Sequence, residues 1–366
     1  MTILQRIWRW GSGLPQADII ENFSRLLIGD VNGNLLTELE VMVPTVSWRL
    51  NEPSSINFTI ARTDPKATET NLRFGNRVYI EFDNGLPPWG GVIDPPRTWN
   101  TDNSITVTCY SGEYILGWRQ TAQEQIYADF YAGGIFRDLI IKANAIKPTG
   151  VILGETWEGG ESLSPEYHFT NVLKILRDQL VKDYTPNDYY IEPSLSNGKI
   201  VFTANYLESR GRDLPQVVLI EGHNIADVKM VEQGPIINSW DIAGSGNSWD
   251  DNRAIGHAED ETSIGLYGLR QSSEIYSESP EQATVDAIAV SRLNGGESPG
   301  TKDVRRMIAV DVVDLAPARF GAYDIGDRIE IVLERYGFGG FAGTVRVMGR
   351  DYQAYDGFCS LIVEEV

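Results

Sequence analysis

The sequence predicts a mainly β protein: two related small β-barrels with a helix-containing α+β domain inserted between them. Apolar and polar residues alternate along most of the chain, as at Val46, Trp48 and Leu50, and this spacing is typical of half-buried strands. In the middle of the chain the apolar residues are spaced as in helices instead. A strand–turn–strand pattern near residue 75 also returns near residue 326.

The first barrel is expected at residues 23–118, after an N-terminal arm at residues 1–22. Asn32-Gly33 separates two apolar runs and is the strongest short hairpin signal in the chain. Alternating runs predict further strands at 56–60, 78–82 and 105–109. The arm contains Trp8, Trp10 and a Gly-Ser-Gly hinge. We expect it to become ordered on a neighbouring subunit, because so short a segment buries too little surface alone.

The α+β domain is expected at residues 119–230. Its first predicted helix ends before Pro148 and has five apolar residues on one face: Ile135, Phe136, Leu139, Ile140 and Ala143. A second helix is predicted over 172–180, with its end near Pro186. A hairpin follows, in which Asn197-Gly198 joins strands at 189–191 and 199–204.

The second barrel is expected at residues 231–366, with a helical insertion near 279–295. Ser279-Pro280-Glu281-Gln282 has the residues of a helix start, and Asn294-Gly295 has those of a helix end. Five alternating or apolar runs predict strands, at 236–242, 308–313, 328–333, 344–348 and 358–363.

An internal repeat relates the two barrels. Gly-Asn-Arg-Val-Tyr-Ile at residues 75–80 returns as Gly-Asp-Arg-Ile-Glu-Ile at 326–331, and the run at 88–93 matches the run at 340–345. Each hairpin is followed by a strand that carries one of the two cysteines, Cys109 or Cys359. Two copies of one small barrel are the simplest explanation of this order.

The same motifs resemble those of bacteriophage tail hub proteins. The resemblance lies in Trp-Gly-Gly-Val-Ile at 89–93, the strand 105–109 and Tyr-Ser-Gly-Glu-Tyr-Ile-Leu at 110–116. Asp-Ile-Gly-Asp-Arg-Ile at 324–329 looks like the matching element of the second barrel, and 280–293 like the helix before it. The resemblance implies a trimer of two-barrel subunits that continues a tail tube. Since Val366 directly follows the last predicted strand, we expect no hydrolase or fibre region after the hub.

Composition and charge exclude several classes of protein. The 366 residues include 51 acidic and 31 basic side chains, a formal net charge of −20, which repels phosphate and argues against a protein that grips nucleic acid. Two cysteines cannot form a disulfide framework or a cysteine-rich zinc site. No run approaches the 18 or so apolar residues of a membrane span, and the N-terminus does not resemble a secretory signal.

The sequence contains no recognisable catalytic, cofactor-binding or metal-binding motif. The three histidines, His168, His223 and His257, are far apart in sequence, and no Gly-x-Ser-x-Gly turn is present. Both cysteines lie in alternating strands, where we interpret them as small buried hydrophobic residues. We therefore expect neither an active site nor a cofactor.

Two features allow a binding function as an alternative. An acidic loop could hold calcium, but its spacing does not match an EF-hand, and a solvated loop is the favoured interpretation; its residues are Asp250, Asp251, Glu259, Asp260 and Glu261. Tryptophans could stack on sugars, but packing in a core or an interface is favoured; the candidates are Trp8, Trp10, Trp89, Trp99 and Trp157.

These observations together predict a structural virion protein at the tail tip or baseplate. It would be a homotrimer that ends the tail tube, joins it to tip, fibre or spike proteins, and leaves a channel through which DNA passes without specific binding. The alternatives are a distal tail ring protein, which would be a hexamer, a cell-wall hydrolase and a glycan-binding adhesin.

Overall fold

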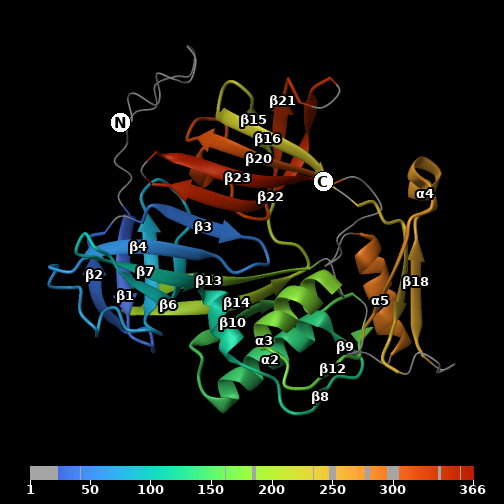
Figure 1. Cartoon of the computed structure of the whole chain (residues 1–366), viewed down its shortest axis with the longest axis horizontal. Helices are drawn as coiled ribbons and strands as arrows, with labels where there is room; N and C mark the ends of the chain where they lie inside the picture. The colour runs from blue at the N-terminus through green and yellow to red at the C-terminus, as the bar shows by residue number, and fades with distance from the viewer. Residues whose placement is uncertain are drawn as a thin grey trace.

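The computed structural model describes most of the chain after residue 23 (Figure 1). The described residues are 24–41, 43–160, 162–183, 187–233, 235–246, 253–276, 281–294, 305–336, 339–354 and 356–366. The N-terminal arm expected at 1–22 lies outside them, as do Ser279, Pro280 and Gly295 of the expected helix caps.

Six strands of the N-terminal part form one curled antiparallel sheet, called here the first barrel. The strands are β1 (Ser24–Gly29), β2 (Leu35–Leu39), β4 (Ser55–Ala61), β5 (Arg77–Phe82), β6 (Trp89–Trp99) and β7 (Ser104–Ser111). Their order is β2-β1-β5-β6-β7-β4. Alternate residues, such as Ile56, Phe58 and Ile60 on β4, fill its core, as the period of two predicts. The 3-10 helix η1 (Gly112–Trp118) leads out of the sheet.

Seven strands form the second sheet, called here the second barrel. They are β15 (Asp213–Ile220), β16 (Ile225–Gln233), β20 (Arg305–Val313), β21 (Arg328–Leu333), β22 (Phe341–Gln353), β23 (Phe358–Glu365) and, from the N-terminal part, β3 (Thr45–Arg49). The short 3-10 helix η3 (Phe320–Ala322) precedes β21. This sheet begins at Asp213 and not near residue 231, because apolar side chains of β15 such as Val217 and Leu219 pack into its core.

The helical domain is assembled from two separate stretches of chain. The first stretch contains α2 (Ala132–Ile146), the one-turn α3 (Val172–Lys174), which continues as the π-helix η2 (Ile175–Asp183), and the sheet β10-β14-β13. Those strands are Val151–Thr156, Lys199–Leu207 and Asp188–Ser196, and the short strands β8 (Gln125–Ile126), β9 (Phe130–Tyr131), β11 (Ser162–Leu163) and β12 (Glu166–Tyr167) form two further pairs.

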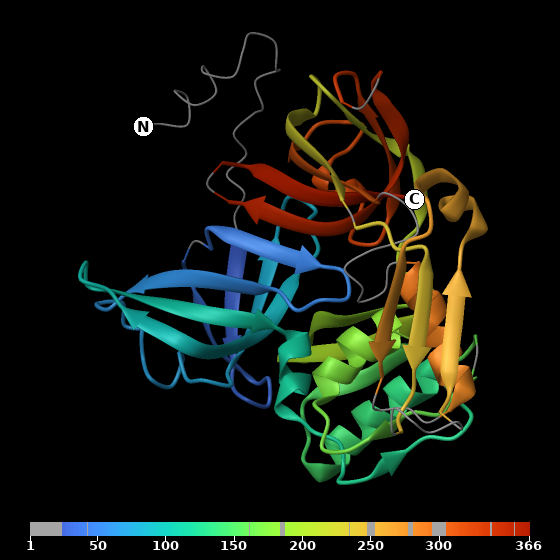
Figure 2. The same ribbon diagram turned by 45° about the vertical axis from the view of Figure 1, so that its right-hand side comes forward.

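The second stretch was expected as part of the second barrel, with a helical insertion near 279–295 only. It contains β17 (Ser239–Ala243), β18 (Ile255–Glu259), α4 (Glu261–Tyr267), β19 (Gln271–Ile275) and α5 (Gln282–Leu293). Trp240 and Ile288 from this stretch share one buried cluster with Phe136 and Leu176 from the first, and the two stretches lie side by side in Figures 1 and 2. The second stretch therefore belongs to the helical core and not to the second barrel, because its apolar side chains, Trp240 included, pack there.

Four strands of each barrel share one topology, which confirms the repeat, whereas the added strands differ: β1 pairs antiparallel with β5, and β15 pairs parallel with β21. Strands β4 to β7 are ordered β5-β6-β7-β4, and strands β20 to β23 are ordered β21-β22-β23-β20. In each copy three consecutive strands are joined in antiparallel fashion, and the strand that precedes them pairs with the third.

The turn before β5 and the turn before β21 also match in their hydrogen bonds. Gly75 has φ 89° and Gly326 has φ 91°, a left-handed conformation that favours glycine. Each glycine N–H donates to a strand carbonyl, of Ile93 in the first barrel and of Val347 in the second. The N–H of that strand residue donates back to the residue after the glycine, all at 2.8–2.9 Å.

This pairing corrects the sequence alignment of the second strands. The alignment placed residues 91–93 on 343–345, whereas the structure places Ile93 on Val347. The β21–β22 ladder has two more residue pairs at its turn end than the β5–β6 ladder. The strand after the turn is therefore displaced by two residues relative to the sequence alignment. For the same reason Cys109 and Cys359 are not equivalent, and Val363 holds the position that matches Cys109.

Candidate functional site

The structure does not bring the three histidines together into one site. His168 Nδ1 lies 2.9 Å from Gln123 O, and His223 Nε2 lies 2.9 Å from Ala316 O. His257 on β18 lies between two carboxylates, with Nδ1 2.7 Å from Asp241 and Nε2 3.3 Å from Glu259. These hydrogen bonds, with Asp241 the largest cause, raise the pKa of His257. These partners are carbonyls and carboxylates, neither of which has a proton that histidine could remove to activate it as a nucleophile.

Both cysteines are free thiols buried in barrel cores. Burial raises the pKa of the Cys359 thiol to about 12 and that of Cys109 further. A thiol that stays protonated is a poor nucleophile, so these positions agree with the expected structural role.

The expected acidic loop is divided by the structure. Asp250 and Asp251 lie outside the described residues. Asp260 is the N-cap of α4, where its side chain accepts a hydrogen bond from Ser263 N at 2.8 Å, and Glu259 contacts His257. Within the described part of the chain, no group of three or more His, Cys, Asp and Glu side chains is arranged to hold a metal ion.

The candidate tryptophans differ in exposure. Trp89 is buried, and its Nε1 donates to Ser54 Oγ at 3.2 Å. Trp157 is half-buried, whereas Trp99 is exposed near the end of β6. Trp8 and Trp10 lie outside the described residues. Trp99 therefore has the surface exposure that a partner or a ligand requires.

Strand β3 joins the two barrels. It belongs by sequence to the N-terminal part, yet it pairs antiparallel with Gly349–Gln353 of β22 in the second barrel (Figure 1). Arg49 forms an ion pair with Asp351 at 2.7 Å, and Thr45 Oγ1 donates to Gln353 Oε1 at 2.9 Å. These contacts attach a strand of the N-terminal part to the second barrel.

Asp188 links all three parts of the molecule through one carboxylate. Its side chain is 1% exposed. It accepts hydrogen bonds from Asn51 Nδ2 at 2.8 Å and from Arg210 N at 2.6 Å, and it forms an ion pair with Arg346 of β22. Asn51 Oδ1 in turn accepts from Tyr189 N at 2.9 Å. We call this group the Asp188 junction.

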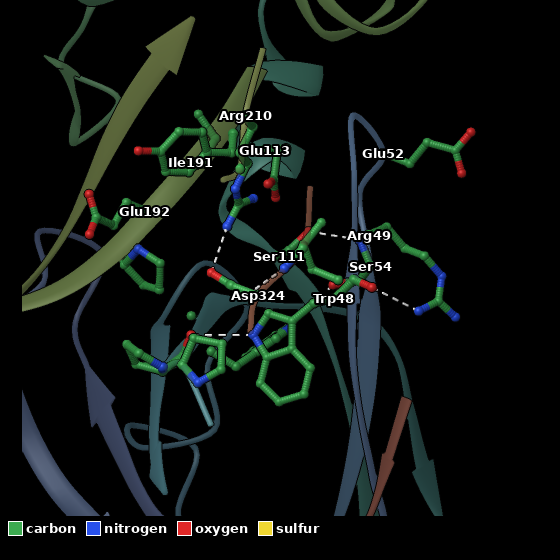
Figure 3. Close-up of a pocket in the computed structure, with 18 of the residues that line it drawn as sticks. Trp48, Arg49, Glu52, Ser54, Ser111, Glu113, Ile191, Glu192, Arg210 and Asp324 are labelled. Carbon is green, nitrogen blue, oxygen red and sulfur yellow. Dashed lines mark hydrogen bonds and ion pairs between the residues drawn. The ribbon is translucent and has the colours of Figure 1, made fainter. Parts of the chain in front are cut away.

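A cleft of about 530 Å³ opens beside the Asp188 junction (Figure 3). All three parts contribute to its lining, among them Trp48, Glu113, Glu192, Arg210 and Asp324. Figure 3 shows Arg210 facing Asp324 across the cleft, and the two form an ion pair at 3.1 Å.

The arginines that line this cleft form ion pairs that hold parts of the molecule together. Its arginines are already paired: Arg49 with Asp351, Arg210 with Asp324 and Arg212 with Asp327. Glu113 differs, because its Oε2 is shielded from solvent without a hydrogen-bond partner. Burial, the largest cause, raises the pKa of this carboxyl, and a hydrogen bond with Ser111 opposes the rise.

Comparison with solved structures shows which known proteins share this fold. No family model matches the sequence, and no curated protein is significantly similar to it. A tail protein from Neisseria meningitidis MC58 has 14% identity and a TM-score of 0.58, over 93% of this chain and 96% of that one. The chain has the fold of phage tail proteins. The 43 kDa tail protein of prophage MuSo2 from Shewanella oneidensis (11%, TM-score 0.57, 93% and 98%) agrees, as does the prophage tail protein gp18 from Listeria monocytogenes EGD-e (13%, 0.55, 93% and 94%).

The phage-tail fold agrees with the expectation that the sequence motifs gave. The similarity extends over both barrels and the helical domain, since it covers 93% of the chain. Among the described residues no helix is long and apolar enough to cross a membrane.

Sequence reasoning missed the residues that hold this tail-protein fold together. Asp188, Arg210 and Arg346 are ordinary charged residues in the sequence, and they meet only because distant elements converge. Asn51 did carry a local signal. It follows a predicted strand and takes φ 59°, a conformation that asparagine tolerates better than most residues.

Proposed function

We propose that this chain is a structural protein of a phage tail tip, a hub that ends the tail tube. Two supports carry the proposal: the phage-tail fold, and two barrels that share a four-strand core and are held together in a single chain by β3 and the Asp188 junction. A joined pair of barrels suits a structural role, because it holds one repeated unit at a set angle to the next.

The same pair of barrels suggests how the hub assembles. Three copies contribute six barrels, which can occupy six similar positions around one ring under closed cyclic symmetry. The proposed partners are the tail tube or a distal tail protein on one side and tip, fibre or spike proteins on the other. The net charge of −20 suits a channel for DNA, since an acidic wall repels phosphate.

The proposed role is non-enzymatic and uses no cofactor. The histidines contact carbonyls and carboxylates, the cysteines are buried, and the arginines of the cleft are paired with carboxylates.

Locating the chain within intact tail particles tests this function. Gold-labelled antibody against the chain should mark only the tip end of purified tails, and antibody against the tube protein should mark the shaft as a control. Label along the whole shaft, or a particle population that contains none of the chain, would contradict the proposal. Peptidoglycan turnover by the purified chain would favour the hydrolase instead.

A further inference from the structure

Arg97 on β6 and Arg350 on β22 occupy equivalent positions in the two barrels. The register of each strand with its following strand makes them correspond. Their side chains also make the same hydrogen bond: Arg97 donates to Leu72 O at 2.9 Å, and Arg350 donates to Tyr323 O at 2.7 Å. Each carbonyl lies three residues before the left-handed glycine of its barrel. The repeat therefore extends to this edge of both sheets.

The equivalent surfaces differ in whether they are covered. Two residues after the arginines, Tyr352 is 1% exposed and its counterpart Trp99 is 60% exposed. Tyr352 lies in the core of its own barrel, where Phe320 packs against its ring at 6.0 Å, and it is covered from the N-terminal part by Phe82, also at 6.0 Å, with β3 paired beside it. In the first barrel, β5 pairs with Trp89–Val92 only, and no described strand lies where β3 lies on β22.

The uncovered surface has the composition of an interface. Arg62 and Arg97 lie over the Trp99 ring at 5.4 and 5.9 Å, and Arg97 also lies over the Phe74 ring at 4.9 Å. We call these four side chains the β6 edge patch. Tryptophan and arginine are the residues most enriched in the energetic centres of protein interfaces. Figure 2 shows the β6–β7 hairpin (teal) projecting away from the rest of the molecule, where a partner can reach it.

The backbone beside the patch is also open. Asn100 N donates to Ser104 O of the hairpin at 2.9 Å. Because neighbouring residues of a strand point their N–H groups to opposite sides, the N–H of Trp99 faces away from β7. An open strand edge with exposed aromatic side chains readily pairs with another chain.

We propose that the β6 edge patch binds a second copy of this chain, which lies beside β6 as β3 lies beside β22. This inference rests on the proposed trimer. A closed ring of alternating barrels has two kinds of junction, one within each chain and one between chains. The junction within the chain uses the β22 edge. The repeat places the same edge on the first barrel, where the neighbouring copy would cover it.

Replacing Trp99 tests the inference against a matched tryptophan. Trp99→Glu should weaken assembly about tenfold or more in its midpoint concentration, as the loss of an interface centre does, measured by native mass spectrometry over a dilution series. Trp118→Glu is the control, because Trp118 is also exposed but lies on η1. Hydroxyl-radical footprinting should show Trp99 oxidised in monomers and protected about tenfold in the assembled wild type, since burial excludes the radical.

The outcomes separate this inference from the proposed function. A trimer in which Trp99 remains as reactive as in the monomer would overturn the β6 edge patch and leave the hub proposal standing. A chain that stays monomeric at all concentrations would overturn both. Protection of Trp99 that needs an added glycan, or a different tail protein, would also overturn the second copy as the occupant.

Discussion

At the scale of single residues, the Asp188 carboxylate joins all three parts of the molecule. It is almost fully buried and satisfies donors from the β3–β4 turn, the β14–β15 connection and β22. Removing it would leave Arg346 without its carboxylate partner and Arg210 N without its acceptor, while Arg346 would keep its hydrogen bonds to the carbonyls of Gly326 and Arg210. A buried group that loses its partner costs more than an exposed ion pair contributes.

We predict that Asp188→Ala lowers the free energy of unfolding by about 3 kcal/mol, measured by urea denaturation. Asp213→Ala is the control, because Asp213 pairs with Arg328 of the same barrel while 77% exposed; it should cost less than about 1 kcal/mol. Equal losses for the two variants would contradict a special role for the Asp188 junction.

Glu113 should give the cleft a pH-dependent stability. Its pKa in the folded protein is raised above the ordinary 4.5, chiefly by burial. A carboxyl whose pKa rises on folding favours the folded state while it is protonated, and that contribution is lost as the pH rises from the unfolded pKa through the folded pKa. At neutral pH the buried charge therefore opposes folding.

The substitution Glu113→Gln should consequently raise the urea midpoint at pH 7 and give no gain below about pH 4, where the wild-type carboxyl is protonated in both states. Glu155→Gln serves as the control, because Glu155 lines the same cleft but is exposed, and it should leave both midpoints unchanged. A gain that is the same at both pH values would show that charge is not its cause.

At the scale of elements, the left-handed turns before β5 and β21 are equivalent but differ in their surroundings. A Cβ added at Gly75 would meet only a side-chain methyl of Val31 at 3.3 Å, whereas one at Gly326 would meet the backbone oxygen of Arg210 at 2.8 Å. Both positions also carry the cost of a left-handed conformation.

We therefore predict that Gly75→Ala lowers the free energy of unfolding by about 1–2 kcal/mol, and that Gly326→Ala lowers it clearly more. Urea unfolding of the two single variants measures the difference. Gly198→Ala is a useful reference for conformation alone, since Gly198 has φ 73° with open space around it. If Gly326→Ala were no worse than Gly198→Ala, the close approach of Arg210 would be of no consequence.

The elements that the sequence predicted are those with strong local patterns. The period of two located most strands of both barrels, and Asn32-Gly33 and Asn197-Gly198 marked real hairpins. Pairings between distant strands have no local signal. The pattern at Val46 and Trp48 predicted a strand correctly, but it could not show that β3 joins the sheet of the other barrel. Similarly, the sequence pattern assigned Trp240 and Ile288 to the second barrel, whereas their contacts place them in the helical core.

At the scale of the whole molecule, we propose that two related barrels in each chain allow three chains to form a ring of six barrels. The matching strand orders and the matching turns support the equivalence. β3 and the Asp188 junction support a fixed relation between the two barrels. The third part, the helical domain, is expected outside the ring, because a helical core inside it would obstruct the channel.

Electron cryomicroscopy of the assembled ring, reconstructed without imposed symmetry, tests this claim most directly. The account predicts threefold symmetry, with six barrels around an open channel, the two barrels of each chain alternating around the ring, and the helical domains at the periphery. A ring of six chains, or one in which the two barrels of a chain lie at unequal distances from the axis, would contradict it.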